Sequence, residues 1–78
     1  MNWKRMSQNR KRDLILSLFD DAECLTVYDM VEKMKQRGVN PPSPKSLAFW
    51  IRNYMKYKYF ECQRDSLTGR QIWMRRPS

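Results

Sequence analysis

The chain has 78 residues, 41% of them apolar, which suffices for one small domain with a single hydrophobic core. Lysine and arginine number 16 against eight acidic residues, and this net charge of +8 favours a polyanionic partner. The lack of histidine excludes a zinc site of the usual ligand count, and the lack of a long apolar run excludes a membrane span, so we expect a cytoplasmic protein with no membrane contact.

The first elements predicted along the chain are a basic arm and a helix. Residues 1–7 form the arm, in which Trp3 and Met6 either fold back onto the domain or stay mobile. The helix is expected to begin after Ser7, a good N-cap residue, and to run to about Asp20. Its apolar stripe consists of Leu14, Ile15, Leu18 and Phe19.

A short strand and a second helix are predicted next. The acidic residues at 20, 21 and 23 indicate a solvated helix end rather than a metal cluster, and residues 24–25 form the strand. Thr26 then caps the second helix, with Asp29 completing a variant of the capping box. This helix should end at Gly38, which can adopt the left-handed conformation. Its apolar face consists of Val27, Met30, Val31 and Met34.

The third helix, residues 43–56, has the strongest start signal in the chain. Ser43 is its cap and Pro44 its first helical residue. The inward face is predicted to carry Leu47, Ile51, Tyr54 and Met55. The outer face is predicted to carry Lys45, Ser46, Phe49, Arg52, Asn53 and Lys56, with Trp50 between the two faces.

A β-hairpin is predicted after the third helix. Its strands cover residues 60–64 and 70–75, joined by a five-residue loop that ends in a glycine. We expect Arg64 opposite Arg70, which turns Trp73 outward. Paired inner positions are then Cys62 with Ile72 and Phe60 with Met74. A slip of one residue would bury Trp73 instead, and the pattern leaves this register open.

The two cysteines and the charges can also be placed on these elements. Cys24 and Cys62 are expected to be buried free thiols, and a disulfide forms only if the fold brings them together. Residues 1–13 have a net charge of +4, residues 14–42 of −2 and residues 43–78 of +6. The excess positive charge is therefore concentrated on particular elements, which favours a polyanionic partner over a uniformly basic surface.

This order of elements, with a Thr-capped second helix and the charged turn 65–70, resembles the winged helix-turn-helix superfamily. The likeness covers residues 8–76 and leaves residues 1–7 as a basic N-terminal arm. It implies an α+β, mainly α fold, with three helices and a C-terminal β-hairpin wing. The turn is similar to those of bacterial and archaeal transcriptional regulators. Nothing after the wing predicts their dimerisation helix, so a homodimer and a monomer are both open.

The resemblance implies that helix 43–56 reads the major groove of DNA, while wing 60–75 contacts the backbone or minor groove. The DNA-binding residues it implies are Ser43, Lys45, Ser46, Phe49, Arg52, Asn53, Lys56, Arg64 and Arg70. Arginine can bond guanine, asparagine can bond adenine, and an apolar ring can contact the thymine methyl group. Two structural alternatives stay open: Ser43 acts only as a cap, and the two wing arginines are only solvated charges.

The sequence thus predicts a double-stranded DNA-binding protein, a small transcriptional regulator with no cofactor and no enzymatic activity. A protein-interaction scaffold is one alternative, in which Phe49, Trp50 and Trp73 would form an exposed apolar patch. An RNA-binding winged helix is the other, because net charge does not distinguish the two polymers.

Overall fold

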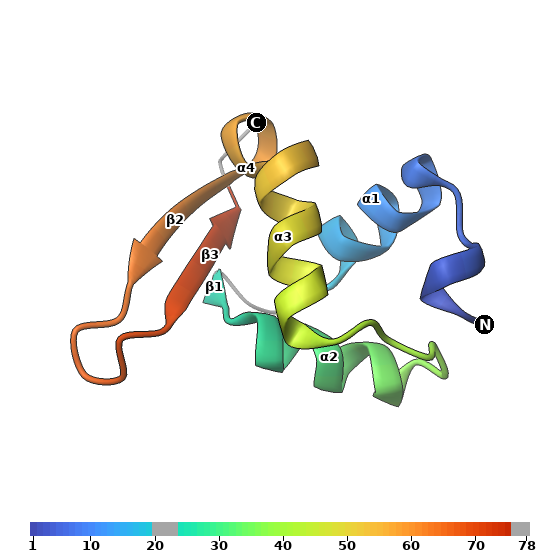
Figure 1. Ribbon diagram of the computed structural model, residues 1–78, viewed down its shortest axis with the longest axis horizontal. Coiled ribbons are helices and arrows are strands. Elements are labelled where there is room, and N and C mark those ends of the chain that lie inside the picture. Colours follow the sequence, from blue (N-terminus) through green and yellow to red (C-terminus); the bar gives the residue numbers. More distant parts are fainter. Residues whose placement is uncertain (20–23, 76–78) are drawn as a thin grey trace.

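The computed structural model describes residues 1–19 and 24–75, with the side chains of residues 56, 57 and 75 outside that description. In chain order the elements are η1 (Trp3–Arg5), α1 (Gln8–Ser17), β1 (Cys24–Leu25), α2 (Val27–Gln36), α3 (Pro44–Tyr54), the single turn α4 (Lys56–Tyr59), β2 (Phe60–Arg64) and β3 (Gln71–Arg75). The fold is α+β and mainly helical, with one antiparallel sheet in the order β1-β3-β2 (Figure 1).

The three longer helices begin at the caps that the sequence predicts. The hydroxyls of Ser7, Thr26 and Ser43 each accept a hydrogen bond from the backbone N–H three residues further on, at 3.1–3.3 Å. The carboxylate of Asp29 accepts from the backbone N–H of Thr26 at 3.1 Å, which completes the capping box. Pro44 occupies the first turn of α3, where its missing N–H costs nothing. Each cap contributes about 1 kcal/mol to stability.

The helix ends depend on contacts further away in sequence. Helix α2 ends before Gly38, whose φ of 77° is the left-handed conformation predicted for it. Helix α1 ends at Ser17, earlier than the predicted end near residue 20. The guanidinium of Arg37 donates to the hydroxyl of Ser17 at 2.6 Å and to its carbonyl at 3.2 Å. The Arg37 side chain thereby donates to a carbonyl that would accept a backbone N–H if α1 continued further.

One hydrophobic core joins the helices to the sheet. Its buried members are Trp3, Ile15, Leu18, Phe19, Leu25, Met30, Val31, Met34, Val39, Leu47, Ile51, Met55, Phe60 and Trp73. These include most of the side chains predicted to face inward. Others, such as Leu14, Val27 and Cys62, are partly buried, whereas Tyr54 is 55% exposed and its ring packs at a tilt against Trp50 at a centroid distance of 5.2 Å. Packing at the edge of the core covers one ring face and leaves the phenol in water.

The hairpin register differs from the predicted one by one residue. Arg64 pairs with Gln71, and Cys62 pairs with Trp73, which is completely buried. The connecting loop is therefore six residues long, closed by a hydrogen bond from the N–H of Asp65 to the carbonyl of Arg70 at 2.8 Å. Burying the large indole outweighs burying the smaller alternatives, even though its N–H has no acceptor among the described residues.

The cysteines lie on different outer strands. Cys24 is on β1 and Cys62 on β2, with β3 between them. Strands two positions apart are separated by about 10 Å, which exceeds the reach of a disulfide. Both thiols are free. The prediction that both are buried is wrong, because Cys24, on a strand of only two residues, is exposed.

The N-terminal segment, residues 1–7, folds back onto the domain. The N–H of Trp3 donates to the carbonyl of Asn40 at 3.1 Å, and the N–H of Asn40 donates to the carbonyl of Met1 at 2.7 Å. The Trp3 ring is 5% exposed and meets Trp50 of α3 edge-on at 5.4 Å. The described part of the chain contains no helix that is long and apolar enough to cross a membrane.

Candidate nucleic-acid interface

The outer face of α3 carries a continuous stripe of exposed side chains. Its members are Lys45, Ser46, Phe49, Arg52 and Asn53. Their spacing places them on one side of a helix, and they lie there because Leu47, Ile51 and Met55 bury the opposite side. Phe49 is 64% exposed, the largest apolar surface on this stripe. Five of the six residues predicted for the outer face are therefore exposed on one side of α3, and the side chain of the sixth, Lys56, lies outside the described residues.

The polar groups of this stripe differ in how far they are already used. The Ser43 hydroxyl accepts from the Ser46 N–H at 3.2 Å and donates to its hydroxyl at 3.0 Å, so it acts as a cap. The Asn53 amide donates to the carbonyl of Phe49 at 2.8 Å, which leaves one amide proton and the carbonyl oxygen free. Lys45 and Arg52, the two cations of the stripe, have no ion-pair partner among the described residues, which leaves them available to a ligand.

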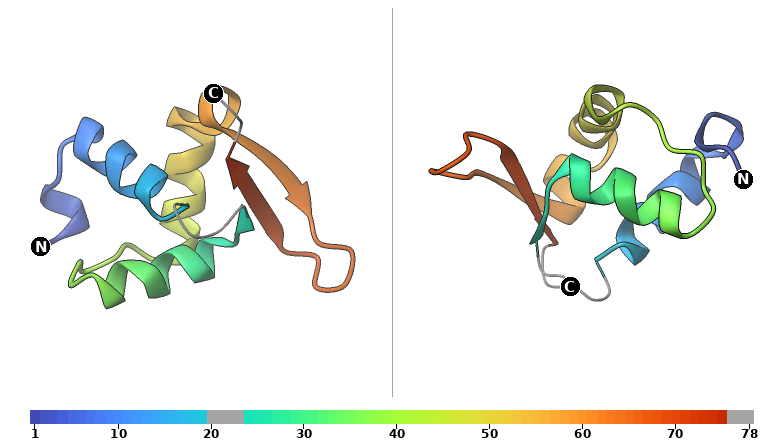
Figure 2. Two further views of the ribbon diagram at one scale, coloured as in Figure 1. Left: turned by 180° about the vertical axis from the view of Figure 1, so that it is seen from behind. Right: turned by 90° about the horizontal axis from the view of Figure 1, so that it is seen from below.

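The β2–β3 hairpin projects from the body beside α3 and does not cover its outer face (Figures 1 and 2). Its turn is held by Asp65, whose carboxylate accepts from the Leu67 N–H at 3.0 Å and from the Thr68 hydroxyl at 3.1 Å. Gly69, with φ of 72°, donates its N–H to the Asp65 carbonyl at 2.8 Å. These bonds hold the apex in one shape while Leu67, at 93% exposure, points into solvent.

Two arginines flank this turn, and they have different surroundings. Arg64 ends β2 and is exposed. The guanidinium of Arg70 lies 4.6 Å from the ring centre of Tyr28, in the first turn of α2. Stacking covers the face of a guanidinium and leaves the N–H groups at its edge free for an anion. The turn end of the hairpin is therefore anchored to α2 by a contact that also orients a cationic group.

Sequence reasoning missed Tyr28 as a member of this site. An exposed tyrosine in the first turn of a helix carries no local signal that it meets an arginine 42 positions later. The side chain of Lys56, which the sequence places in the site, lies outside the described residues. Lys58 is exposed, with its ammonium 5.7 Å from the Tyr59 ring. The structure therefore exposes the α3 stripe, places the two arginines at the turn of the neighbouring hairpin (Figure 1), and adds Tyr28 beside Arg70.

Neither a metal site among the described residues nor a known relative identifies what this surface binds. Across residues 1–19 and 24–75, no three histidine, cysteine or acidic side chains lie close enough to hold a metal ion. The acidic residues at 20, 21 and 23, predicted to be a solvated helix end, lie outside these ranges. No family model, curated protein or solved structure matches the chain. Its function is therefore argued from its own residues.

Proposed function

We propose that the chain is a double-stranded DNA-binding protein with a winged helix-turn-helix fold, acting as a small transcriptional regulator. Helix α3 is its recognition helix and the β2–β3 hairpin is its wing. The observation that carries this proposal is the outer face of α3, an exposed polar stripe with two free cations, beside a projecting hairpin that bears two more. Neighbouring elements with unpaired positive charge suit the backbone and grooves of a duplex.

The chemistry of the α3 stripe fits base edges in the major groove. Arg52 can bond guanine through two N–H groups, and Lys45, in the first turn, reaches guanine or a nearby phosphate. Asn53 retains one donor and one acceptor, which is the pair that adenine requires. Phe49 supplies an apolar contact for the thymine methyl group. The stripe thus contains groups for more than one base type.

The wing supplies contacts that do not depend on base identity. Arg64 is free to reach a phosphate or the minor groove, and Arg70 presents the edge of its guanidinium from its stack on Tyr28. Positive groups on the two elements allow α3 to be set in register with the duplex by backbone contacts.

The structure supports the protein-interaction scaffold less well than the sequence does. It needs Phe49, Trp50 and Trp73 to share an exposed apolar patch, but Trp73 is completely buried and Trp50 is only partly exposed. The exposed parts of Phe49, Trp50 and Tyr54 together are still a smaller surface than a stable protein interface requires. DNA binding is therefore the better supported of the two functions.

Binding to random-sequence duplex at low salt tests the proposal, with fluorescence anisotropy as the readout. A DNA-binding protein retains measurable non-specific affinity that falls steeply with salt. After selection of a preferred site, we expect Arg52→Ala to cost about 1–3 kcal/mol and to relax preference at one base position. Arg64→Ala should weaken binding to all sequences and reduce the salt slope by about one.

A matched control removes the same charge elsewhere. Lys35 pairs with Glu32 on α2 at 3.7 Å, so Lys35→Ala should leave affinity and base preference close to those of the parent. An RNA duplex of the same length identifies the RNA-binding alternative if it competes more strongly than DNA. Absence of any duplex binding at low salt, in a folded protein, would falsify the proposal.

A further inference from the structure

A shallow hollow of about 500 Å³ lies between η1 and the first turn of α1, away from the α3 stripe and the wing. Its lining residues are Met1, Asn2, Arg5, Met6 and Arg10. The two arginines come from separate elements and are both exposed. A small hollow lined by two arginines has the chemistry of a site for an oxyanion such as phosphate.

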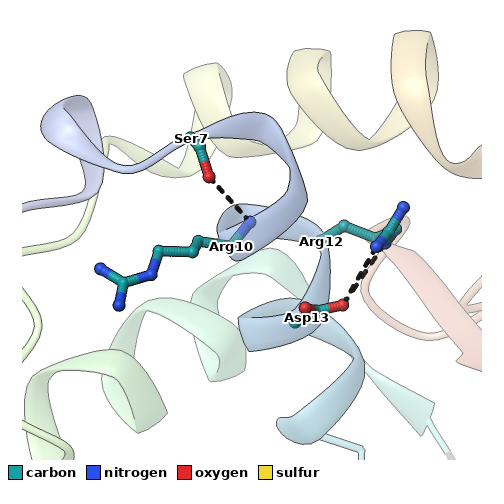
Figure 3. A network of polar contacts seen from close by, with 4 residues as sticks. All are labelled: Ser7, Arg10, Arg12 and Asp13. Atoms are coloured by element: carbon teal, nitrogen blue, oxygen red, sulfur yellow. Dashed lines mark hydrogen bonds and ion pairs between the residues drawn. The ribbon is translucent and has the colours of Figure 1, made fainter.

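Neither arginine of the hollow has an ion-pair partner among the described residues. Arg12, two positions after Arg10, pairs with the carboxylate of Asp13 at 3.4 Å. Figure 3 shows the Arg10 guanidinium pointing away from that pair. The first turn of α1 contains no acidic residue, so its positive charge opposes the helix dipole. The positive charge of Arg10 therefore destabilises the start of α1, and a bound anion would offset this repulsion.

The wall of the hollow is held in place by the core. Arg5 follows Trp3 by two residues, and the buried Trp3 ring packs against Trp50 of α3. The hydrogen bond between Trp3 and Asn40 adds a second attachment. Arg5 is thus carried on a segment fixed relative to the recognition helix, as a preorganised site requires.

The hollow also lies at a useful place in the molecule. Helix α3 stands between the N-terminal segment and the wing in every view (Figures 1 and 2). These two parts occupy opposite ends of the longest axis, along which the molecule extends 34 Å. One helical turn of B-form DNA is about 34–36 Å long. A duplex that lies along this axis, with α3 in its major groove, would pass both ends within about one turn.

We propose that the hollow is a phosphate-binding site, in which Arg5 and Arg10 together hold one backbone phosphate of the duplex that α3 reads. This contact lies on the side of α3 opposite the wing. The protein therefore contacts the DNA backbone on both sides of the recognition helix. The proposal rests on the proposed function and adds to it a separate backbone site.

The test measures the salt dependence of duplex binding for Arg5→Met, Arg10→Met and the double variant. Methionine keeps much of the side-chain stem and removes the charge. Because the arginines share one phosphate, the double variant should reduce the slope of log affinity against log salt by about 0.9. Each single variant should lose less than half of that amount, because the remaining arginine still neutralises the shared phosphate. Arg12→Met is the control, and its slope should stay at the parent value. Ethylation interference should identify one phosphate, on the side of the DNA site that faces the N-terminal segment. Its ethylation should weaken binding by the parent and not by the double variant.

The outcomes separate this site from the proposed function. Parent protein that binds no duplex removes both proposals. Parent binding with an unchanged slope in the double variant overturns the phosphate site alone. A loss of about 1.8 in the double variant, the sum of two phosphate contacts, also overturns it, because the arginines would then act separately. An equal loss in Arg12→Met would reduce the effect to general charge and overturn it as well.

Discussion

The two ends of the molecule each carry a pair of arginines, but they are held by different forces. At the wing, the turn is shaped by polar bonds around Asp65, and its base is attached through the stack of Arg70 on Tyr28. At the N-terminal end, the segment is attached mainly by burial of Trp3 in the core, together with backbone hydrogen bonds to Asn40. The turn of the wing, unlike the buried Phe60 and Trp73 at the other end of the hairpin, should thus be adjustable without unfolding the domain, whereas the N-terminal segment should not be.

The N-terminal attachment gives the largest expected effect. Trp3→Ala removes a ring that is 5% exposed, and we expect it to lower the free energy of unfolding by about 3–5 kcal/mol. A domain of this size has a total stability of only about 4–12 kcal/mol, so we expect a large fraction of the Trp3→Ala variant to be unfolded at 37 °C. Urea denaturation followed by circular dichroism measures the change.

Trp3→Phe is the matched control for this substitution. It keeps an aromatic ring against Trp50 and should recover a large part of the lost stability. A loss below about 1 kcal/mol for Trp3→Ala would show that the N-terminal segment is a peripheral arm, and the contrast between the two ends would then disappear.

The turn of the wing gives an intermediate effect. Asp65→Ala removes the acceptors for the Leu67 N–H and the Thr68 hydroxyl, and we expect a loss of about 1–2 kcal/mol confined to the hairpin. Amide hydrogen exchange should become faster at Leu67, while exchange in α1 stays unchanged. Asp65→Asn is the control, since its side-chain oxygen can still accept from Leu67. If Asp65→Ala destabilised α1 and the hairpin equally, the wing would not be an independent unit.

The features that could be predicted from sequence are those set within one turn of the chain. The starts of the long helices follow from Ser7, Thr26 and Ser43, whose hydroxyls bond a backbone group three residues away. The stripe on α3 follows from helical periodicity alone, since its spacing determines one face. Local chemistry of this kind is readable before the fold is known.

The features that could not be predicted depend on contacts between distant elements. The hairpin register turns on whether Trp73 finds room in the core beside Phe60, whose ring centre lies 6.4 Å away. The end of α1 depends on Arg37, and the anchoring of the wing depends on Tyr28. None of these pairings has a sequence spacing that marks it. The candidate site was therefore predictable as a set of charges on two elements, but not in how the wing is held.

The smallest expected effect on stability concerns that anchor. Tyr28→Ala removes the ring under Arg70, and we expect a loss of only about 0.5–1 kcal/mol, because the pair is partly exposed. Duplex affinity should fall more than this stability change suggests, since Arg70 then loses the orientation that directs its free edge outward. Anisotropy titrations of the parent and the variant, at a single low salt concentration, provide the comparison.

Tyr28→Phe separates orientation from any direct role of the phenol. It keeps the ring beneath Arg70, so its affinity should match the parent if stacking is what matters. Arg70→Lys, which keeps the charge but not the planar face, should then resemble Tyr28→Ala rather than the parent. If Arg70→Lys bound as tightly as the parent, the anchor would be irrelevant to binding. The wing would then act through its charge alone, whatever its angle to α2.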